Sequence, residues 1–363
     1  KCRDLPPEVI ETFEKEGKPS TLRFKLNPEV IEVTDLIRGH LSFDTAFMDD
    51  FIIAKDFNTP LYNFAVVVDD YLMKISHVIR GEEHISNIPK QVLLDRALGF
   101  DVPTFAHLSL ILNPDRSKLS KRQNKVSLLE YRQDGFLPHA IINFIAFLGW
   151  NPGGDKEIYS LDEMVELFDM EKVNKSGAIF NIQKLEWYNN HYIRSADISE
   201  ITRECMRFYI ESHVLREGTQ EGEYLTNEGE PIDFETIARI VNLERERVKR
   251  LADIPENTRY FFQKDLSVPQ ELLRWKSMTD EQVQDALHFV HDVVIGIPED
   301  SFDPQTIEQA LKAAIKETGR ENGAVLWPLR VALTGLEKSP NPFDVASILG
   351  KDITIQRIKR VIT

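Results

Sequence analysis

The spacing of apolar residues changes in type near Ser195, and this change limits the possible fold more than any other feature. Up to that point, short runs typical of β-strands occur at Thr21 to Lys25, Asp50 to Ala54, Phe64 to Val68 and Leu72 to Ile79. Beyond it, amphipathic segments follow one another and no strand pattern persists. The sequence therefore predicts a mixed α/β part followed by an all-α part.

Helices are predicted where capping residues flank an amphipathic segment. Proline at the start and glycine after the end mark one helix between Pro6 and Gly17 and a second between Pro89 and Gly99. Ser160-Leu161-Asp162-Glu163 is a capping box, and it opens a helix whose predicted apolar stripe is Leu161, Met164, Val165 and Phe168.

Turn signals separate the segments of the helical part. They are the stretch Asn227 to Pro231, the cap and first-turn proline Asp303-Pro304, and the predicted helix ends at Gly319, Gly335 and Gly350. A chain of 363 residues is too long for one ordinary domain, so two to four domains are expected.

The net charge of −15 argues against a protein that holds nucleic acid through a broad basic surface. Any RNA binding must therefore depend on local patches of positive charge. Three such patches are Lys118, Lys121, Arg122 and Lys125; Arg245, Arg247, Lys249 and Arg250; and Arg357, Lys359 and Arg360. Taken singly, each patch is explained as well by a solvated helix face or loop.

Two cysteines in 363 residues exclude a disulfide scaffold and indicate a reducing compartment. The sequence contains neither a signal peptide nor an apolar run long enough to cross a membrane. We therefore expect a soluble, cytoplasmic protein with no membrane partner.

The basic pentapeptide Lys118 to Arg122 follows the turn Asn113-Pro114-Asp115, and both lie downstream of the segment Val78 to His84. Two lysines on a mobile loop that also contains serine suit the neutralisation of a triphosphate as pyrophosphate leaves. An acidic amino acid needs a planar cation, and Arg80 supplies one. The combination indicates nucleotide-activated chemistry on an amino acid.

Three blocks of this sequence resemble bacterial glutamyl-tRNA synthetase, a class I aminoacyl-tRNA synthetase. They are PLYNFAVVVDDYLMKISHVIRGEEHISNIPKQVLLDRALG, HLSLILNPDRSKLSKR and SLLEYRQDGFLPHAIINFIAFLGW, and KLSKR stands where that class has its KMSKS signature. The similarity extends from CRDLPPE near the start to PLRVALTG near the end, which is nearly the whole chain.

The resemblance implies the second half of a class I, Rossmann-like catalytic domain, a stem-contact region and a helical anticodon-binding domain. The implied divisions are the remainder of an inserted acceptor-binding domain (1–60), the catalytic half with the KLSKR loop (61–123), the stem-contact domain (124–197) and the anticodon-binding domain (198–363, two subdomains meeting near 262). The related glutaminyl enzymes resemble β-barrels in their anticodon-binding part, so a helical second half favours the glutamyl family.

The family places a substrate-binding arginine at Arg80 and a pocket-lining tyrosine at Tyr62. Arg80 precedes Gly81 at the end of a predicted strand, where a side chain can project from a sheet edge. The alternatives are an ion pair of Arg80 with Glu82 or Glu83, and a core role for Tyr62. Leu61 and Asn58 depart from the threonine and glycine that are common in the family, which puts the detailed shape of the pocket in doubt.

The resemblance assigns ATP binding to the KLSKR loop. The second lysine of the signature, Lys121, contacts the phosphates, Lys118 assists through its charge, and Ser120 lies between them. ATP with Mg²⁺ is then a substrate. The glutamate carboxylate attacks the α-phosphate and a terminal tRNA hydroxyl attacks the resulting anhydride, so the protein supplies positioning and electrostatic stabilisation.

The HIGH-type motif of class I synthetases is not found in this sequence, and His77 and His84 do not replace it. We therefore expect residues 1–363 to be a fragment that is inactive by itself. Several relatives bind zinc with two upstream cysteines and a pair that corresponds to Cys2 and Asp4. A vestigial half-site is the most that remains, so we predict no metal in this chain and zinc only in a full-length protein.

Anticodon contacts are implied at three positions. Arg247 falls on the arginine that reads the third anticodon base in discriminating glutamyl enzymes, and arginine can donate twice to a base edge. Arg330 belongs to the block PLRVALTG, and Ser339 lies in a loop close behind it. Leu329 and Leu333 of the same block are predicted to be core residues.

The expected partners are tRNA-Glu, ATP, L-glutamate and, as a further partner that the resemblance allows, a tRNA-dependent amidotransferase. Two other hypotheses stay open at this point. One is a non-catalytic tRNA-binding or assembly protein derived from the synthetase, and the weaker one is a glutaminyl-type enzyme.

Overall fold

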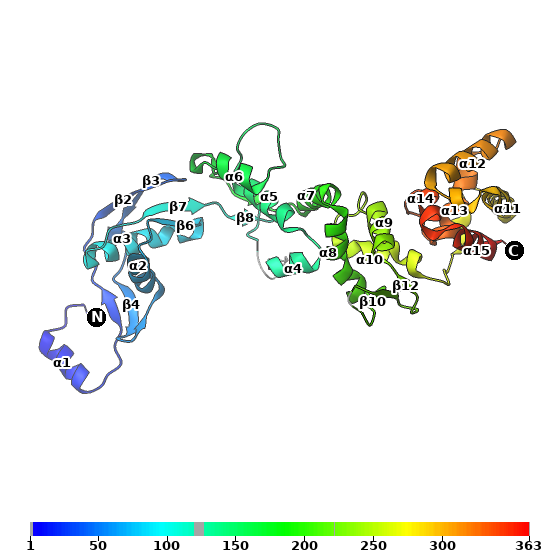
Figure 1. Cartoon of the computed structure of the whole chain (residues 1–363). Coiled ribbons are helices and arrows are strands. Elements are labelled where there is room, and N and C mark those ends of the chain that lie inside the picture. Colours follow the sequence, from blue (N-terminus) through cyan, green and yellow to red (C-terminus); the bar gives the residue numbers. More distant parts are fainter. Residues whose placement is uncertain (1–2, 120–126, 221, 363) are drawn as a thin grey trace. The chain divides into compact units, whose positions relative to one another are not determined.

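The computed structural model describes residues 3–119, 127–220 and 222–362 (Figure 1). The chain forms two compact units, the first made of Lys1–Asn124 and Ile142–Asn181 and the second of Lys125–Ile141 and Ile182–Thr363. Cys2, Ser120 and Lys121 lie outside the described residues, as do Arg122 and Lys125 of the first basic patch. Among the described residues, every helix is too short or too polar to span a bilayer.

The first unit is built on a four-stranded sheet in the order β3-β2-β7-β6. Its strands are β2 (Val30–Asp35), β3 (Gly39–Asp44), β6 (His77–Gly81) and β7 (Thr104–Leu108). The hairpin β2–β3 is antiparallel, whereas β7 runs parallel to both β2 and β6. The chain passes from β6 through a 3₁₀ segment (Glu82–Asn87) and α3 (Ile88–Leu98) to β7, which is a parallel crossover.

One predicted strand is wrong, because Phe64 to Val68 lies inside the helix α2 (Tyr62–Leu72). A short apolar run does not distinguish a buried strand from a buried helix segment, and here α2 packs against α3 and β4. The next strand begins later than predicted. Lys74 has a positive φ of 57° in the turn after α2, so β6 starts only at His77.

The predictions for the other N-terminal elements are confirmed. A helix α1 (Pro7–Lys15) is followed by Gly17 at a φ of 66°, and α3 ends at Gly99 in the left-handed conformation. The strands β1 (Leu22–Phe24), β4 (Phe51–Asp56) and β5 (Thr59–Pro60) form a separate antiparallel sheet.

The core of the first unit joins the four-stranded sheet to α3. It consists of Leu26, Ile31, Ile88, Val92, Leu93 and Phe105. A smaller cluster joins Ile37 and Ala106 to Trp150 and Val173, which follow α5 (Pro138–Gly149). These contacts fix the carboxyl ends of β2 and β7 relative to one another.

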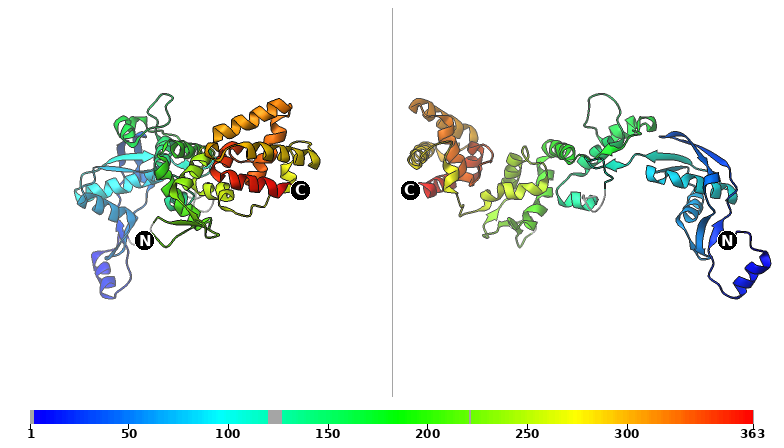
Figure 2. Two further views of the ribbon diagram at one scale, coloured as in Figure 1. Left: turned by 45° about the vertical axis from the view of Figure 1, so that its right-hand side comes forward. Right: turned by 180° about the vertical axis from the view of Figure 1, so that it is seen from behind.

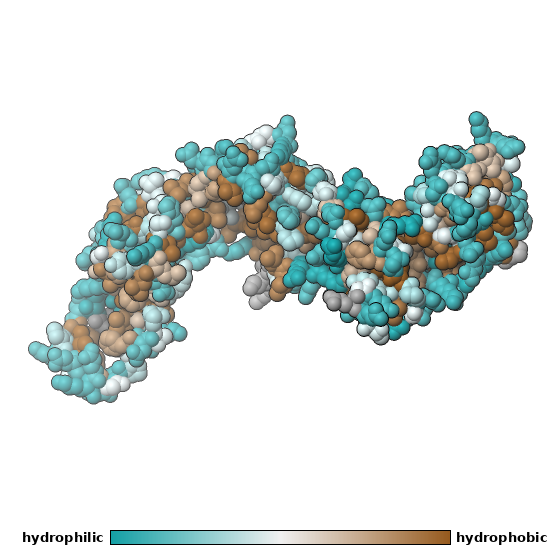
Figure 3. All heavy atoms as spheres, viewed as in Figure 1, coloured by the Kyte–Doolittle hydropathy of each residue, from teal (hydrophilic) through white to brown (hydrophobic). Residues whose placement is uncertain are grey.

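The capping box at Ser160 and Glu163 is confirmed at the start of α6 (Leu161–Leu167). The predicted stripe is mostly not buried, since Met164 is buried but Leu161, Val165 and Phe168 are exposed. Phe168 lies beyond the end of the helix. Hydrophobic residues accordingly reach the surface around α5 and α6 (Figure 3). The remaining short pairing in this unit joins β8 (Ile111–Leu112) to β9 (Ala178–Ile179).

The second unit starts with α4 (Leu128–Gln133) and continues with α7 (Ile182–Ser195), α8 (Ile198–Glu211), α9 (Phe234–Glu244) and α10 (Ile254–Thr258). The prediction of no strand after Ser195 is wrong. Strands β10 (Leu215–Glu217), β11 (Tyr224–Thr226) and β12 (Pro231–Ile232) form an antiparallel sheet, with the predicted turn between the last two. Strands of two or three residues are too short to show an alternating pattern.

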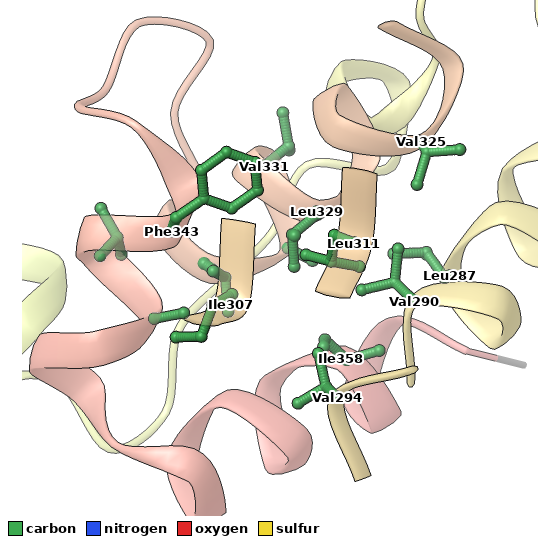
Figure 4. Packing of buried hydrophobic residues seen from close by; sticks show 14 of the residues in the cluster. Leu287, Val290, Val294, Ile307, Leu311, Val325, Leu329, Val331, Phe343 and Ile358 are labelled. Atoms are coloured by element: carbon green, nitrogen blue, oxygen red, sulfur yellow. The ribbon is translucent and has the colours of Figure 1, made fainter. Parts of the chain in front are cut away.

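The α-helices α11 to α15 form the C-terminal part of the second unit (Figure 2). They are α11 (Asp280–Gly296), α12 (Pro304–Thr318), α13 (Asn322–Thr334), α14 (Pro342–Leu349) and α15 (Lys351–Val361). Leu287, Val290, Leu311, Leu329 and Ile358 meet between these helices (Figure 4). The Asp303 cap and the helix ends at Gly319, Gly335 and Gly350 are confirmed.

The third predicted basic patch is corrected by the burial of Arg357, of which 3% is exposed. Its guanidinium donates to the carbonyl oxygens of Leu333, Tyr260 and Gln263. Leu333 belongs to α13, and Tyr260 and Gln263 belong to the 3₁₀ segment Arg259–Phe262 and its C-cap, so two segments each need a donor inside the protein. Arg357 therefore ties α15 to its neighbours and does not face a ligand.

Candidate functional site: the carboxyl end of the parallel sheet

Arg80 is the penultimate residue of β6, and it lies at the carboxyl end of the parallel part of the sheet. Ligands of open α/β sheets bind at this edge. Gly81 follows it, and a Cβ there would collide with the carboxylate of Glu83. Glycine at position 81 thus lets the backbone pass close to Glu83, directly after the residue whose side chain lies at the end of the sheet.

A buried carboxylate, Asp35, ends strand β2, which is separated from β6 by β7, and it is 1% exposed. Its Oδ1 accepts hydrogen bonds from the backbone N–H groups of Ile37, Arg38 and His107 at 2.9, 2.8 and 3.2 Å. Burial opposes the charge, but these bonds and the one from the His107 ring hold the pKa of Asp35 below its usual value. Asp35 is therefore ionised at neutral pH.

His107 connects Asp35 to Arg80. Its Nδ1 lies 2.6 Å from Oδ2 of Asp35, and its Nε2 accepts a hydrogen bond from Nε of Arg80 at 3.1 Å. Burial lowers the pKa of His107, and the positive charge of Arg80 lowers it further, while Asp35 opposes both. A neutral ring with its proton on Nδ1 satisfies both neighbours.

Arg80 has a second neutral partner in Gln91, whose Oε1 accepts from Nη2 at 2.9 Å. Gln91 in turn donates to Oδ1 of Asn63 at 3.2 Å. Burial lowers the pKa of Arg80, and interactions with Tyr62, Asp70 and Asp35 oppose this. The guanidinium keeps its charge at neutral pH because its usual pKa is so high.

Tyr62 begins α2 and interacts with Arg80 through its phenol. Its side chain is 51% exposed, so Tyr62 is not a core tyrosine. The ring lies 5.9 Å from that of His84, centroid to centroid. The structure thus brings together the two residues that are predicted to bind glutamate.

The alternative pairing of Arg80 with Glu82 or Glu83 is not found among the described contacts. Glu82 forms an ion pair with Arg38 at 2.7 Å and accepts from the N–H of Leu110 at 3.1 Å. Glu83 lies 3.4 Å from Nζ of Lys118. Both carboxylates therefore have other partners, and the positive charge of Arg80 is not cancelled by them.

Lys118 lies on the exposed edge of the loop that follows β8, and its contact with Glu83 places it near β6. The turn before it is built by Asn113, whose N–H donates to the Ser117 carbonyl, and by Asp115, which accepts from the Ser117 N–H. Of the three predicted phosphate-binding residues, Lys118 is described, and Ser120 and Lys121 lie outside the described residues.

Sequence reasoning missed Asp35, His107 and Gln91. His107 begins the block HLSLILNPDRSKLSKR, yet nothing in the linear pattern marks it, because its two partners are 72 and 27 positions away. A polar residue at the end of an apolar strand is the signal that was available. It applies to His107 after Phe105-Ala106 and to Asp35 after Val33-Thr34.

Two predicted anticodon residues, Arg247 and Arg330, lie close enough in the second unit for their charges to interact. Arg330 donates from Nη1 to the carbonyl oxygen of Ser339 at 2.9 Å. Burial lowers the pKa of Arg330, and the charge of Arg247 adds to this. The Ser339 side chain is itself buried, so Ser339 contributes through its carbonyl, which orients Arg330.

Arg247 lies in the turn after α9 and is partly exposed. Its Nη1 is 3.5 Å from Oε2 of Glu244, a residue that is 1% exposed. Asn257 donates to the other oxygen of Glu244 at 3.0 Å, while Oε2 accepts no hydrogen bond among the described atoms. Burial raises the pKa of Glu244 to about 7, although Arg247 and Asn257 oppose the rise.

The predicted zinc half-site is represented by Asp4 alone, because Cys2 lies outside the described residues. Asp4 is 3.8 Å from Nζ of Lys25. The described part of the chain contains no group of three or more histidine, cysteine, aspartate or glutamate residues arranged to hold a metal ion.

Comparison with known proteins connects this site to a family. The catalytic-domain model of class I tRNA synthetases (E and Q) matches residues 1–187, and an anticodon-binding-domain model matches residues 202–362. A glutamate–tRNA ligase of Caldanaerobacter subterraneus is 41% identical over 363 residues, which is 100% of this chain and 72% of that protein. The chain belongs to the glutamate–tRNA ligase family.

Further relatives of this family show the same extent of similarity. The glutamate–tRNA ligase of Carboxydothermus hydrogenoformans is 40% identical over 99% of the chain and 72% of its own length. The crystal structure of a glutamate tRNA ligase from Elizabethkingia meningosepticum, in complex with its amino acid, superposes with a TM-score of 0.82 at 32% identity. It covers 99% of this chain and 71% of that one.

The family resemblance and the predicted order of an α/β catalytic part and a helical anticodon-binding part are thereby confirmed. Members of this ligase family use ATP with Mg²⁺ as a substrate and bind tRNA and glutamate. The Arg80 site lies inside the match to the catalytic domain, and Arg247 and Arg330 lie inside the match to the anticodon-binding domain.

The burial of the Glu244 carboxyl group gives a stability prediction for the second unit. With a folded pKa near 7 against a usual value of 4.5, native Glu244 binds its proton more tightly than the unfolded chain does. Stability is therefore lost as pH rises from about 4.5 to about 7. We expect Glu244→Gln to stabilise α9 and α10 by up to roughly 3 kcal/mol at pH 8, and by much less at pH 5.

Amide hydrogen exchange of α9 and α10 measures this effect locally, since a chain of two units need not unfold in one step. Glu256→Gln is the matched control, because Glu256 is exposed and pairs with Arg259 on the protein surface. Equal protection of Glu244→Gln and the natural chain at pH 8 would contradict the expectation.

Proposed function

We propose that this chain provides part of the machinery that attaches L-glutamate to tRNA-Glu with ATP, through a glutamyl-adenylate. The observation that carries the proposal is the state of Arg80. It is a charged guanidinium at the carboxyl end of a parallel sheet, held by the neutral partners His107 and Gln91 beside the half-exposed Tyr62. Such a group can bind a carboxylate of glutamate through a charge-assisted hydrogen bond.

The chemistry divides between Arg80 and the KLSKR loop. Arg80 and Tyr62 orient glutamate, so that a carboxylate oxygen attacks the α-phosphate of ATP and pyrophosphate leaves. Lys118 and Lys121, with Ser120 between them, neutralise the charge on the departing phosphates. Lys118 lies 3.4 Å from Glu83, so its ammonium group lies near the end of β6.

The anticodon is read by Arg247 and Arg330, with the Ser339 carbonyl orienting the latter. The proposed domains are residues 1–60, 61–123, 124–197 and 198–363, and the last of them has two subdomains that meet near residue 262. A tRNA-dependent amidotransferase as partner, a cytoplasmic location, and zinc bound through Cys2 and Asp4 in a longer protein are proposals of the same kind.

Residues 1–363 alone do not complete the catalytic site. No HIGH-type motif is present among them to face the KLSKR loop across ATP. Among the described residues β6 pairs with β7 alone, and Ile79 on this edge strand is 51% exposed. Leu72, Met73 and Ile75, which precede β6, are exposed as well. Parallel sheets are normally covered on both faces, and exposed edge strands are normally protected. A further part of the fold is therefore expected to pack against β6 and the exposed residues before it.

The first prediction from this function concerns residues 1–363 as an isolated polypeptide. We expect them to bind tRNA-Glu in a gel-shift titration, because the anticodon-binding part is complete in its packing. With ATP, Mg²⁺ and radiolabelled glutamate they should form no glutamyl-tRNA, while the natural protein that contains them should. Glutamyl-tRNA formation by residues 1–363 at the rate of the natural protein would refute the incomplete site.

The second prediction tests Arg80 in the natural protein. Arg80→Lys keeps the charge but loses the planar fork, so the KM for glutamate should rise roughly tenfold or more, and Arg80→Gln should raise it further. The KM for ATP should stay nearly constant. Arg96→Gln is the control, because Arg96 is an exposed arginine of the same unit that pairs with Glu29. An unchanged glutamate KM in Arg80→Gln would remove Arg80 from the site.

The third prediction tests Arg247 through tRNA choice. Replacing it with glutamine removes a charged double donor, so the ratio of tRNA-Gln to tRNA-Glu charging should rise by roughly tenfold, which corresponds to the 1–3 kcal/mol that one bidentate base contact contributes. Arg250→Gln is the matched control from the same basic patch, since Arg250 is held by Asp253. Equal ratios in the two variants would exclude Arg247 from anticodon selection.

A further inference from the structure

Three side chains form a continuous hydrogen-bonded row across three adjacent strands of the first unit. Asp35 lies at the end of β2, His107 in β7 and Arg80 in β6. The two links, Oδ2 of Asp35 to Nδ1 of His107 and Nε2 of His107 to Nε of Arg80, measure 2.6 and 3.1 Å. Asp35 and His107 are completely enclosed, and the row reaches the surface only at its Arg80 end.

The proton positions along the row follow from its two ends. Oδ1 of Asp35 already accepts three backbone N–H groups, and an ionised carboxylate has no proton to donate. His107 must therefore donate from Nδ1. Arg80 has donors only, so Nε2 of His107 must present its lone pair. The row admits one state of the imidazole, which is neutral with its proton on Nδ1.

This state of His107 determines how Arg80 can meet a carboxylate. A guanidinium binds a carboxylate either side-on, through Nε and Nη2, or end-on, through Nη1 and Nη2. Here Nε donates to His107, and Nη2 donates to Gln91 and lies 3.5 Å from the carbonyl oxygen of His84, so the protein already occupies the side-on approach and Nη2. Among the described hydrogen bonds Nη1 has no acceptor, so it is the nitrogen left to receive the ligand, and the phenol of Tyr62 interacts with the same guanidinium.

We propose that His107 is a positioning residue of the glutamate site. Held in its Nδ1–H state by Asp35, it fixes Arg80 so that Nη1 can donate to a substrate carboxylate, and it leaves the positive charge of Arg80 uncancelled. A carboxylate in place of His107 would hold Arg80 equally well but would neutralise it. This inference rests on the proposed function, since it assumes that Arg80 binds glutamate.

The competing explanation is purely structural, in that Asp35 and His107 simply join β2 to β7. Three substitutions separate the two explanations. His107→Gln places an amide oxygen near the position of Nε2, so it can still accept from Arg80. His107→Asn reaches only the Nδ1 position, so it keeps a donor for Asp35 and loses the acceptor for Arg80. Asp35→Asn places an amide N–H opposite Nδ1, which favours the tautomer with its proton on Nε2, facing the donors of Arg80.

The experiment measures kcat and the KM for glutamate and for ATP by tRNA glutamylation, in the natural protein that contains these residues, together with the thermal midpoint of each variant. We expect the glutamate KM to rise roughly tenfold or more in His107→Asn and Asp35→Asn, and about threefold or less in His107→Gln. The ATP KM should change by less than about twofold, because ATP does not contact the row.

The outcomes separate the two levels of the proposal. A raised glutamate KM in Arg80→Gln combined with equal glutamate KM values for His107→Asn and His107→Gln overturns the role of His107 alone. Loss of thermal stability in the His107 variants with an unchanged glutamate KM also overturns it, in favour of the structural explanation. An unchanged glutamate KM in Arg80→Gln overturns the glutamate site itself, whatever the His107 variants do.

Discussion

The first unit depends on one buried charge, the carboxylate of Asp35. A carboxylate buried away from water is stable only if its oxygen atoms accept hydrogen bonds from the protein. Asp35 accepts them from three backbone N–H groups and from the His107 ring. Two of the backbone donors fix the turn after β2, and the third belongs to β7. The requirement of a single carboxylate thus sets the turn, the strand pairing and, through His107, the direction of Arg80.

Features that depend on neighbours in the chain were predicted well from the sequence. The helix ends at Gly99, Gly319 and Gly335 and the capping box at Ser160 are local, because the residues that make them lie within a few positions of one another. The position of Arg80 at the end of a strand is also local, because an apolar run followed by Arg-Gly marks it. The ordered blocks of family residues then supplied what no pattern in the chain contains, namely the substrate and the tRNA.

Features decided by distant residues were missed, and each has its own physical cause. Helix α2 was mistaken for a strand because its β-branched run is stabilised as a helix only by packing on α3 and β4. Arg357 was assigned to the surface because its three carbonyl partners are 24 to 97 positions away. His107 and Gln91 were overlooked for the same reason, so the sequence pointed to Arg80 and not to the residues that hold it.

The arginines of this acidic chain differ in what they contact. Arg38, Arg250, Arg274 and Arg320 lie against carboxylates, which cancel their charge locally. Arg80 contacts an imidazole and an amide, and Arg330 contacts a carbonyl oxygen. With a net charge of −15, most of the surface repels an anion. On such a surface a positive potential is strongest where a cation has uncharged partners, as Arg80 and Arg330 have, and a negative charge on one of those partners would weaken it.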